Sequence, residues 1–288
     1  SPVTGGVVQS TRVLLPEKVV RSSWGQVTDA VRIEWLMVRP AGLAVGEPTT
    51  LPLSLELRLP YGSGDPEVLV ELDNTIQDHR LRLHVKTEQA KRALAGAAFG
   101  FTEREWVPDQ VPKPPSGYPG ERVYPTLFSR DLLVVPGVAG GLAVAHSGLH
   151  EFQLLEAEGR TEGAFTVLRA VGTLSRGDGL WRRCQAGPSL PTPEAQCPGR
   201  HSVRLALAVL PPGSSPADAV ARLRGHTRPA RVAEARLLPY GSGGTAPLGE
   251  SAAVVLSDPR VVVSSCRPEA GGVLLLLCNR GDEAVDLD

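Results

Sequence analysis

The chain has 288 residues, of which 42% are hydrophobic, so it can bury a large core in one large domain or in two smaller ones. Its 30 lysine and arginine residues are balanced by 31 aspartate and glutamate residues, which leaves a formal net charge of -1. A chain without a net basic field neither attracts polyanions nor gains from counterion release. We therefore expect no nucleic acid and no membrane as a partner.

No segment of the sequence is predicted to enter a membrane or to direct secretion. The longest apolar run, residues 273–278, is far shorter than the ~20 residues that a membrane-spanning helix needs. The chain begins with Ser-Pro and lacks the charged and then apolar segments of a secretory leader, although the missing initiator Met leaves processing further upstream open. These observations predict a cytoplasmic protein.

The four cysteines favour reduced thiols, because they are few, far apart and form no C-x-x-C pair. Cys266 and Cys278 fall on predicted strands, and we expect both to be small buried hydrophobic residues. Cys184 and Cys197 have the better spacing for a disulfide, and whether they pair stays open.

Short apolar or alternating runs, separated by 31 glycines and 26 prolines, predict strands and turns for most of the chain. So many strands from one long segment predict an all-β fold, built as a large antiparallel sandwich. The predicted strands before residue 212 are 27–38, 51–59, 67–72, 81–85, 132–135, 141–145, 151–156, 164–171 and 203–209.

Residues 70–87, VELDNTIQDHRLRLHVKT, contain a strand with two different faces. Leu81, Leu83 and Val85 alternate with basic residues, which is the period of two of a strand with one buried side. The basic face is expected to meet solvent or a partner domain. It is formed by Arg80, Arg82, His84 and Lys86.

A long proline-rich segment lies between strand-rich regions. Residues 107–125 contain six prolines and two glycines, which remove backbone donors and restrict φ. We predict a loop here, either disordered or functional.

One helix is predicted near residue 215. Ser215 is the expected N-cap, Pro216 lies in the first turn, Asp218 is the capping partner, and Gly225 is expected to end the helix. Further strands are predicted at 252–256, 261–264 and 273–278, followed by a hairpin-type Asn-Arg-Gly-Asp turn.

No residue pattern in the chain forms a convincing catalytic or metal site. Glycoside hydrolysis needs two carboxyl groups, and the candidate pairs Asp73 with Asp78, Glu103 with Glu105, and Glu151 with Glu156 are more simply interpreted as solvated strand charges. His146 and His150 are the closest histidines, but they flank a predicted turn without further ligands at metal-site spacing. We therefore predict no metal ion in this chain.

Four ordered motifs resemble the C-terminal half of glycoside hydrolase family 38 α-mannosidases, of the bacterial mannosylglycerate-hydrolase-like type. They are LDNTIQDHRLRL, GLHEFQLLE, LRAVGTLSR and TPEAQCPG. The resemblance weakens after about residue 212. It implies a galactose-mutarotase-like β-supersandwich over residues 1–212, a helix and linker over 213–246, and the start of a small C-terminal β-sandwich domain over 247–288.

The resemblance also implies where the chemistry lies. The zinc ion and the catalytic residues of these retaining enzymes belong to an N-terminal catalytic domain, so no catalytic residue and no cofactor are expected in this chain. In the family the β region folds back against that domain and lends side chains to the sugar cleft. The matching segments FTEREW and VYPTLF indicate Arg104 and Tyr124 as substrate-binding residues.

Two functions follow as hypotheses. In the first, the chain is the non-catalytic C-terminal region of an α-mannosidase, inactive by itself, with an α-mannoside and its own N-terminal catalytic domain as partners. In the alternative, it is a free-standing carbohydrate-binding or mutarotase-like β-sandwich. A purely structural interaction domain is a third interpretation, and it predicts a large apolar patch.

Overall fold

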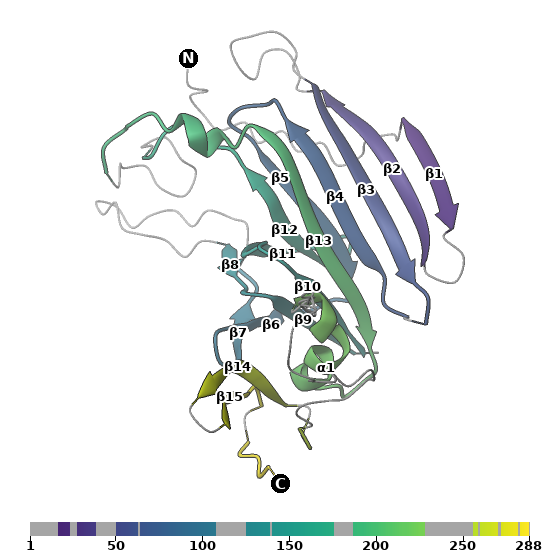
Figure 1. Ribbon diagram of the computed structural model, residues 1–288. Coiled ribbons are helices and arrows are strands. Elements are labelled where there is room, and N and C mark those ends of the chain that lie inside the picture. Colours follow the sequence, from purple (N-terminus) through teal and green to yellow (C-terminus); the bar gives the residue numbers. More distant parts are fainter. Residues whose placement is uncertain are drawn as a thin grey trace, which may run out of the picture.

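The structure is a computed structural model that describes residues 17–23, 28–38, 50–62, 64–107, 125–138, 140–175, 187–227, 256–258, 260–269, 272–281 and 283–287. Figure 1 shows two layered sheets with a helix and a two-stranded hairpin at one end. Every pairing between the named strands is antiparallel. The prediction of an all-β antiparallel fold with one linking helix is therefore confirmed.

The larger sheet has nine strands in the order β1-β2-β3-β4-β13-β10-β9-β6-β7. At its centre, β4 pairs with β13, although the two strands are far apart in the sequence. Their register runs from Gly199 opposite Asn74 to Ala206 opposite Glu67. The strands are β1 (Lys18–Ser23), β2 (Thr28–Val38), β3 (Thr50–Pro60), β4 (Glu67–Asn74), β6 (Arg92–Gly96), β7 (Phe101–Glu105), β9 (Leu132–Gly137), β10 (Gly140–His146) and β13 (Gly199–Leu210).

The smaller sheet has four strands in the order β5-β12-β11-β8. They are β5 (Arg80–Thr87), β12 (Arg160–Arg169), β11 (Glu151–Ala157) and β8 (Thr126–Phe128). A bulge between Thr166 and Leu168 shifts the register of β12 against β5. The sheet order places β5, with its predicted basic face, at one edge and the three-residue strand β8 at the other.

The main core lies between the two sheets. Alternate residues of facing strands meet there, as the period of two requires. Phe152 and Phe165 are fully buried and lie 6.3 Å apart between ring centroids. The larger sheet contributes Val68, Val70, Leu72, Leu133, Val135, Val144 and Leu205.

The centre of the nine-stranded sheet is buried on its other face as well. There the intervening residues Ala143, Ala145, Ala206 and Ala208 pack beneath Ala219, Val220 and Leu223 of helix α1 (Pro216–Thr227). Small alanine side chains on the sheet leave room for the helix to approach. Central strands covered on both faces explain the nearly continuous apolar runs of β9 and β10.

Helix α1 begins as the sequence predicts. Asp218 accepts a hydrogen bond from the backbone N–H of Ser215 at 2.7 Å, and the N–H of Asp218 donates to Ser215 Oγ at 3.3 Å, which forms a capping box. The predicted end at Gly225 is wrong, because the helix continues to Thr227. The last turn is held by His226, whose Nδ1 lies 2.9 Å from Glu67 Oε1 on the sheet.

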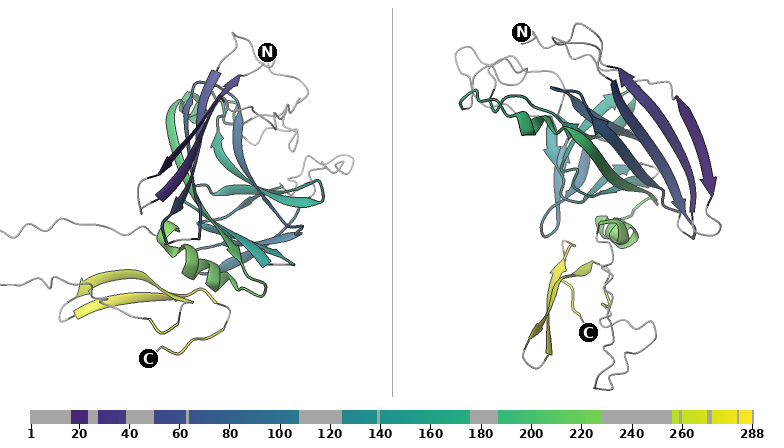
Figure 2. Two further views of the ribbon diagram at one scale, coloured as in Figure 1. Left: turned by 90° about the vertical axis from the view of Figure 1, so that its right-hand side faces the viewer. Right: turned by 45° about the horizontal axis from the view of Figure 1, so that its top comes forward.

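A hairpin of β14 (Val261–Glu269) and β15 (Gly272–Asn279) follows the helix, and Figure 2 shows α1 between the sandwich and this hairpin. Val262 joins the core cluster of the helix-covered face. Arg280, just after β15, is 7% exposed, lies 3.4 Å from Asp131, and stands over the ring of Phe101. The hairpin is thus fastened to the nine-stranded sheet by apolar and ionic contacts.

Eleven predicted strands are confirmed, including the two at 261–264 and 273–278, and four observed strands have no counterpart in the sequence prediction. These four are β1, β6, β7 and β8. The predicted strand at 252–256 and the predicted loop at 107–125 fall almost wholly outside the described residues. The predicted domain limits 1–212, 213–246 and 247–288 stay predictions.

The expectation for the cysteines is partly wrong. Cys266 lies on β14 but is exposed, and Cys278 on β15 is half-buried, because a two-stranded hairpin covers only one of its faces. Cys197 is a free thiol.

Among the described residues, no helix is long and apolar enough to cross a membrane.

Candidate functional site

Arg104 lies on β7, the edge strand of the nine-stranded sheet, opposite Ala93 of β6. Ala93 belongs to the core between the sheets, so strand pairing directs the Arg104 side chain toward that inner face. Its Nε atom is buried and has no hydrogen-bond partner among the described residues. A buried N–H without a partner costs free energy, so this group is available to an acceptor. Tyr124, the other predicted sugar-binding residue, lies outside the described residues.

A small cavity lies beside Trp106, just after the end of β7. This cavity of about 10 Å³ is lined by Gln89, Ala90, Lys91, Trp106, Glu156 and Thr161. Such a volume holds about one water molecule. Arg104 is not among the residues that line this cavity.

A larger groove lies at the opposite edge of the same sheet, over β1, β2 and β3. Its volume is about 580 Å³, within the usual range of ligand sites, but it is open. Leu57 and Leu59 on its wall are 42% and 47% exposed. Because Arg104 is on the other edge strand, this groove is a different place from the predicted sugar site.

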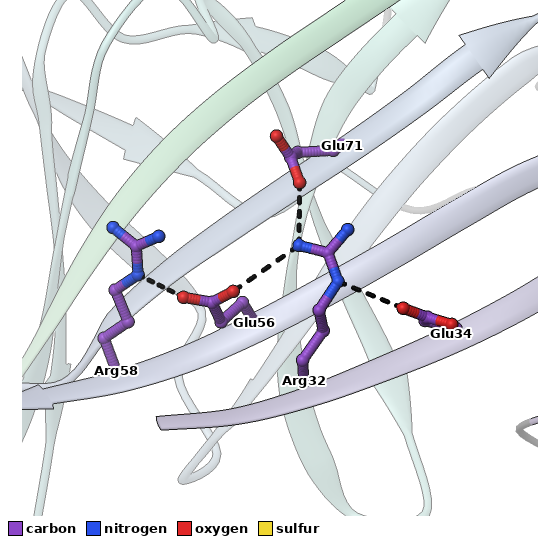
Figure 3. Close-up of polar contacts among 5 residues, drawn as sticks. All are labelled: Arg32, Glu34, Glu56, Arg58 and Glu71. Atoms are coloured by element: carbon purple, nitrogen blue, oxygen red, sulfur yellow. Dashed lines mark hydrogen bonds and ion pairs between the residues drawn. The ribbon is translucent and has the colours of Figure 1, made fainter. Parts of the chain in front are cut away.

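Five charged side chains form a network across β2, β3 and β4 (Figure 3). Arg32 Nη1 lies 2.8 Å from Glu71 and 3.4 Å from Glu56, and Arg32 Nε lies 3.3 Å from Glu34. Arg58 pairs with the other oxygen of Glu56. Three carboxylates thus share two guanidinium groups on the sheet face opposite the main core.

The network changes the titration of its members. Hydrogen bonding to Glu71 is the main reason that the pKa of Arg32 is raised. Burial would raise the pKa of Glu56, but the hydrogen bonds and charges of Arg58 and Arg32 outweigh it and lower that pKa. Both carboxylate and guanidinium therefore stay charged, which suits a structural ion-pair network and leaves no group poised for proton transfer.

Two of the sequence motifs meet in one polar cluster. Asn74 Nδ2 donates to the carbonyls of Gln196 and Cys197, both at 2.9 Å. Asp78, at φ 52°, accepts from Gln196 Nε2 at 3.0 Å and from the N–H of Gly172 at 2.9 Å. Gln196 Oε1 in turn accepts from the N–H of Asp78 at 2.8 Å. The motifs DNTIQDH and TPEAQCPG are therefore structural partners, and Asp78 acts as an acceptor for backbone and amide groups.

The two central histidines are structural as well. His146 is 3% exposed, and its Nε2 lies 3.1 Å from Ser129 Oγ. Burial lowers the pKa of His146 to about 4. His150 stacks on Phe128. Within the described residues, no group of three or more His, Cys, Asp or Glu side chains could hold a metal ion.

The fold and these clusters define an antiparallel β-sandwich whose polar groups mainly join its own strands. Comparison with known proteins shows which proteins this chain is similar to. No family model matches the chain. The chain is 32% identical, over 177 residues, to a protein of Halalkalibacterium halodurans described as a "Putative mannosylglycerate hydrolase", and the match covers 61% of this chain and 17% of that protein.

Two solved structures from Enterococcus faecalis show the same fold. An alpha-mannosidase is 17% identical with a TM-score of 0.56, and a protein of glycosyl hydrolase family 38 is 16% identical with a TM-score of 0.57. Each match covers 73% of this chain and 24% of the solved chain. The resemblance to family 38 α-mannosidases is thus confirmed, and the chain spans about a quarter or less of the proteins it matches.

Proposed function

We propose that this chain is the non-catalytic, C-terminal β region of an α-mannosidase. The observation that carries the proposal is the overlap of an all-β chain with only 17% to 24% of much longer proteins, two of them described as an alpha-mannosidase and a family 38 glycosyl hydrolase. Zinc and the catalytic carboxylates would then belong to another domain of a retaining enzyme, and none to this chain. The expected partners are an α-mannoside and that catalytic domain.

Arg104 is the described residue best suited to such a role. Its unpartnered Nε–H, at the edge of the inner face, can donate to a sugar hydroxyl once a catalytic domain closes the site. Tyr124 would add an aromatic face and a phenol group. The exposed leucines of the groove over β1 to β3 offer apolar surface for packing against that domain.

An activity assay tests the proposal. The purified chain, supplied with zinc, should not hydrolyse an aryl α-mannoside, whereas an enzyme containing the catalytic domain should. In that longer enzyme, Arg104→Ala should lower kcat/KM about tenfold, as expected for one hydrogen bond to substrate. Clear turnover by the isolated chain would refute the proposal.

The alternative function is a free-standing carbohydrate-binding or mutarotase-like module. It is favoured by the sandwich fold and by the unpartnered donor of Arg104. Calorimetric titration with mannose and galactose separates the two. A free-standing module should saturate with one of these sugars, and the α-mannosidase region should bind both weakly.

A further inference from the structure

Strand β15 forms one edge of the hairpin sheet, and it contains no charged residue. Its residues, from Gly272 to Asn279, are GVLLLLCN. Among the described strands it pairs with β14 only. Val273, Leu276 and Leu277 are 63%, 52% and 42% exposed. Figure 2 shows the hairpin beyond helix α1, at one end of the molecule. The strand thus presents large apolar side chains at an open sheet edge.

The other sheet edges carry features that discourage a further strand from pairing. Proteins protect an edge with charged side chains, proline, a bulge or a very short strand. Strands β1, β5 and β7 carry charged residues, and β8 has three residues. The other strand of the hairpin, β14, contains a bulge and carries Arg267, Pro268 and Glu269. Among the edges that the structure describes, β15 alone lacks all of these features.

The hydrogen bonds of the hairpin determine which backbone groups of β15 point to the open edge. In an antiparallel pair, residues that exchange hydrogen bonds alternate with residues that do not. Arg280 N–H donates to the carbonyl of Arg260 at 2.9 Å, so the even-numbered residues of β15 bond to β14. Pro268, which has no N–H, lies opposite Val273 and agrees with this alternation. The odd-numbered residues of β15 therefore direct their N–H and C=O groups to the open edge.

This edge is complementary to a second copy of itself. With a two-fold axis at Leu275, Val273 lies opposite Leu277 of the second copy, and Leu274 lies opposite Leu276. Each opposed pair is aliphatic, and the outward backbone groups of the odd-numbered residues meet as hydrogen-bonded pairs. Neither strand brings a charge to the contact, and a net charge of -1 per chain gives little repulsion. A second copy thus satisfies both the backbone and the side chains of β15.

We propose that this chain forms a two-fold symmetric dimer in which β15 pairs antiparallel with β15 of a second copy. The two hairpins become one sheet in the order β14-β15-β15-β14, whose outer edges are the protected strands β14. Association stops at the dimer, because a two-fold contact closes on itself. Small interfaces belong to weak complexes, so we expect a dissociation constant on the order of 10 μM. The dimer goes beyond the proposed function and does not depend on it, because it concerns self-association alone.

Sedimentation equilibrium of the purified chain over a concentration series tests the dimer. The expected result is a monomer–dimer equilibrium without larger species. Val273→Lys places an ammonium group opposite Leu277 in both copies and should raise the dissociation constant about tenfold or more. Val138→Lys is the matched control, because it is the same change at a residue that is 95% exposed in the turn after β9. It should leave the dissociation constant within twofold.

Hydrogen exchange at low and high protein concentration identifies the strand that pairs. The N–H groups of Val273, Leu275 and Leu277 should exchange more slowly in the dimer, whereas those of Leu274 and Leu276, already bonded to β14, should change less. This measurement uses the unaltered chain, so it holds even where a variant unfolds the hairpin. Circular dichroism verifies that each variant is folded.

Three results would overturn the proposal. The first is a chain that stays monomeric throughout the concentration series. The second is a dimer that Val273→Lys and Val138→Lys weaken equally. The third is a dimer in which the odd-numbered residues of β15 gain no protection from exchange, because another surface would then hold the two copies together.

Discussion

Single polar side chains join parts of this protein that are far apart in sequence. Gln196 and Asp78 exchange hydrogen bonds across 118 residues, and Asn74 binds the carbonyls beside Gln196. Ser129 donates to the carbonyl of Leu132 and leaves its oxygen to accept from His146 Nε2. In this hydrogen-bond arrangement the proton of neutral His146 is on Nε2, and its buried Nδ1 has no hydrogen-bond partner among the described residues.

The buried histidine predicts a pH dependence of stability. The folded protein keeps His146 neutral down to a pKa of about 4, whereas the unfolded chain protonates it near 6.5. The unfolded state therefore binds more protons between these values. The contribution of neutral His146 to the free energy of unfolding is fully present above pH 6.5. As the pH falls toward 4, about 3 kcal/mol of this contribution is lost.

Urea unfolding at a series of pH values measures this effect. His146→Gln should reduce the loss of stability between pH 6.5 and 4. Between pH 7 and 8, where His146 is neutral in both states, its contribution should not vary, which provides the internal control. An identical pH profile for the variant would contradict the assignment of this loss to His146.

At the level of elements, the hairpin and helix α1 are held on one face of the nine-stranded sheet. Leu223 is fully buried against the alanines of β10 and β13, and Arg222 pairs with Asp65 at 2.6 Å. The hairpin depends on fewer contacts, chiefly Val262 and Arg280. Its two strands could not stay ordered alone, because an isolated hairpin is marginally stable in water.

Removal of the Arg280 side chain should loosen the hairpin. Arg280→Ala leaves Asp131 without its ionic partner and exposes the ring of Phe101, and we expect a cost of about 3 kcal/mol. Hydrogen exchange should become faster across Val261–Asn279 and stay unchanged in β4 and β13. Arg267→Ala is the control, since Arg267 is exposed and pairs only with Glu269 of the same hairpin among the described residues. Unchanged exchange in β14 and β15 of Arg280→Ala would show that other contacts hold the hairpin.

At the level of the whole molecule, the two sheets depend on one apolar layer. Phe165 of the smaller sheet is fully buried against Phe152 and the aliphatic residues of the larger sheet. The outer faces instead carry ion pairs, on β2 to β4 and on β5, β11 and β12.

Truncation of the shared core should destabilise both sheets together. Phe165→Ala should cost about 3 to 5 kcal/mol in chemical unfolding. Phe128→Ala removes the same atoms from a side chain that is 51% exposed and should cost much less. A single cooperative transition followed by fluorescence and circular dichroism is expected for both variants. Similar losses for the two variants would show that the inter-sheet layer is not the main source of stability.

The sequence alone determined the all-β class, eleven strands and the start of the helix, because alternation and capping are local patterns. It missed β6 and β8, which are short, and β6 is rich in alanine and glycine, residues that rarely favour strands by themselves. It also named Arg104 from a family resemblance, without showing its unpartnered Nε. Cytoplasmic location stays a prediction.

Only the tertiary structure decided which distant residues meet. From the sequence, the basic face of β5 was expected to meet solvent or a partner domain. In the structure, cross-strand pairing brings Glu151, Gln153 and Glu162 to it from strands about 70 to 80 residues away. The pairing of β4 with β13 likewise unites two motifs that the sequence separates. Local patterns determine the face of a strand that is buried, whereas strand order and register determine its neighbours, and these depend on the packing of the whole chain.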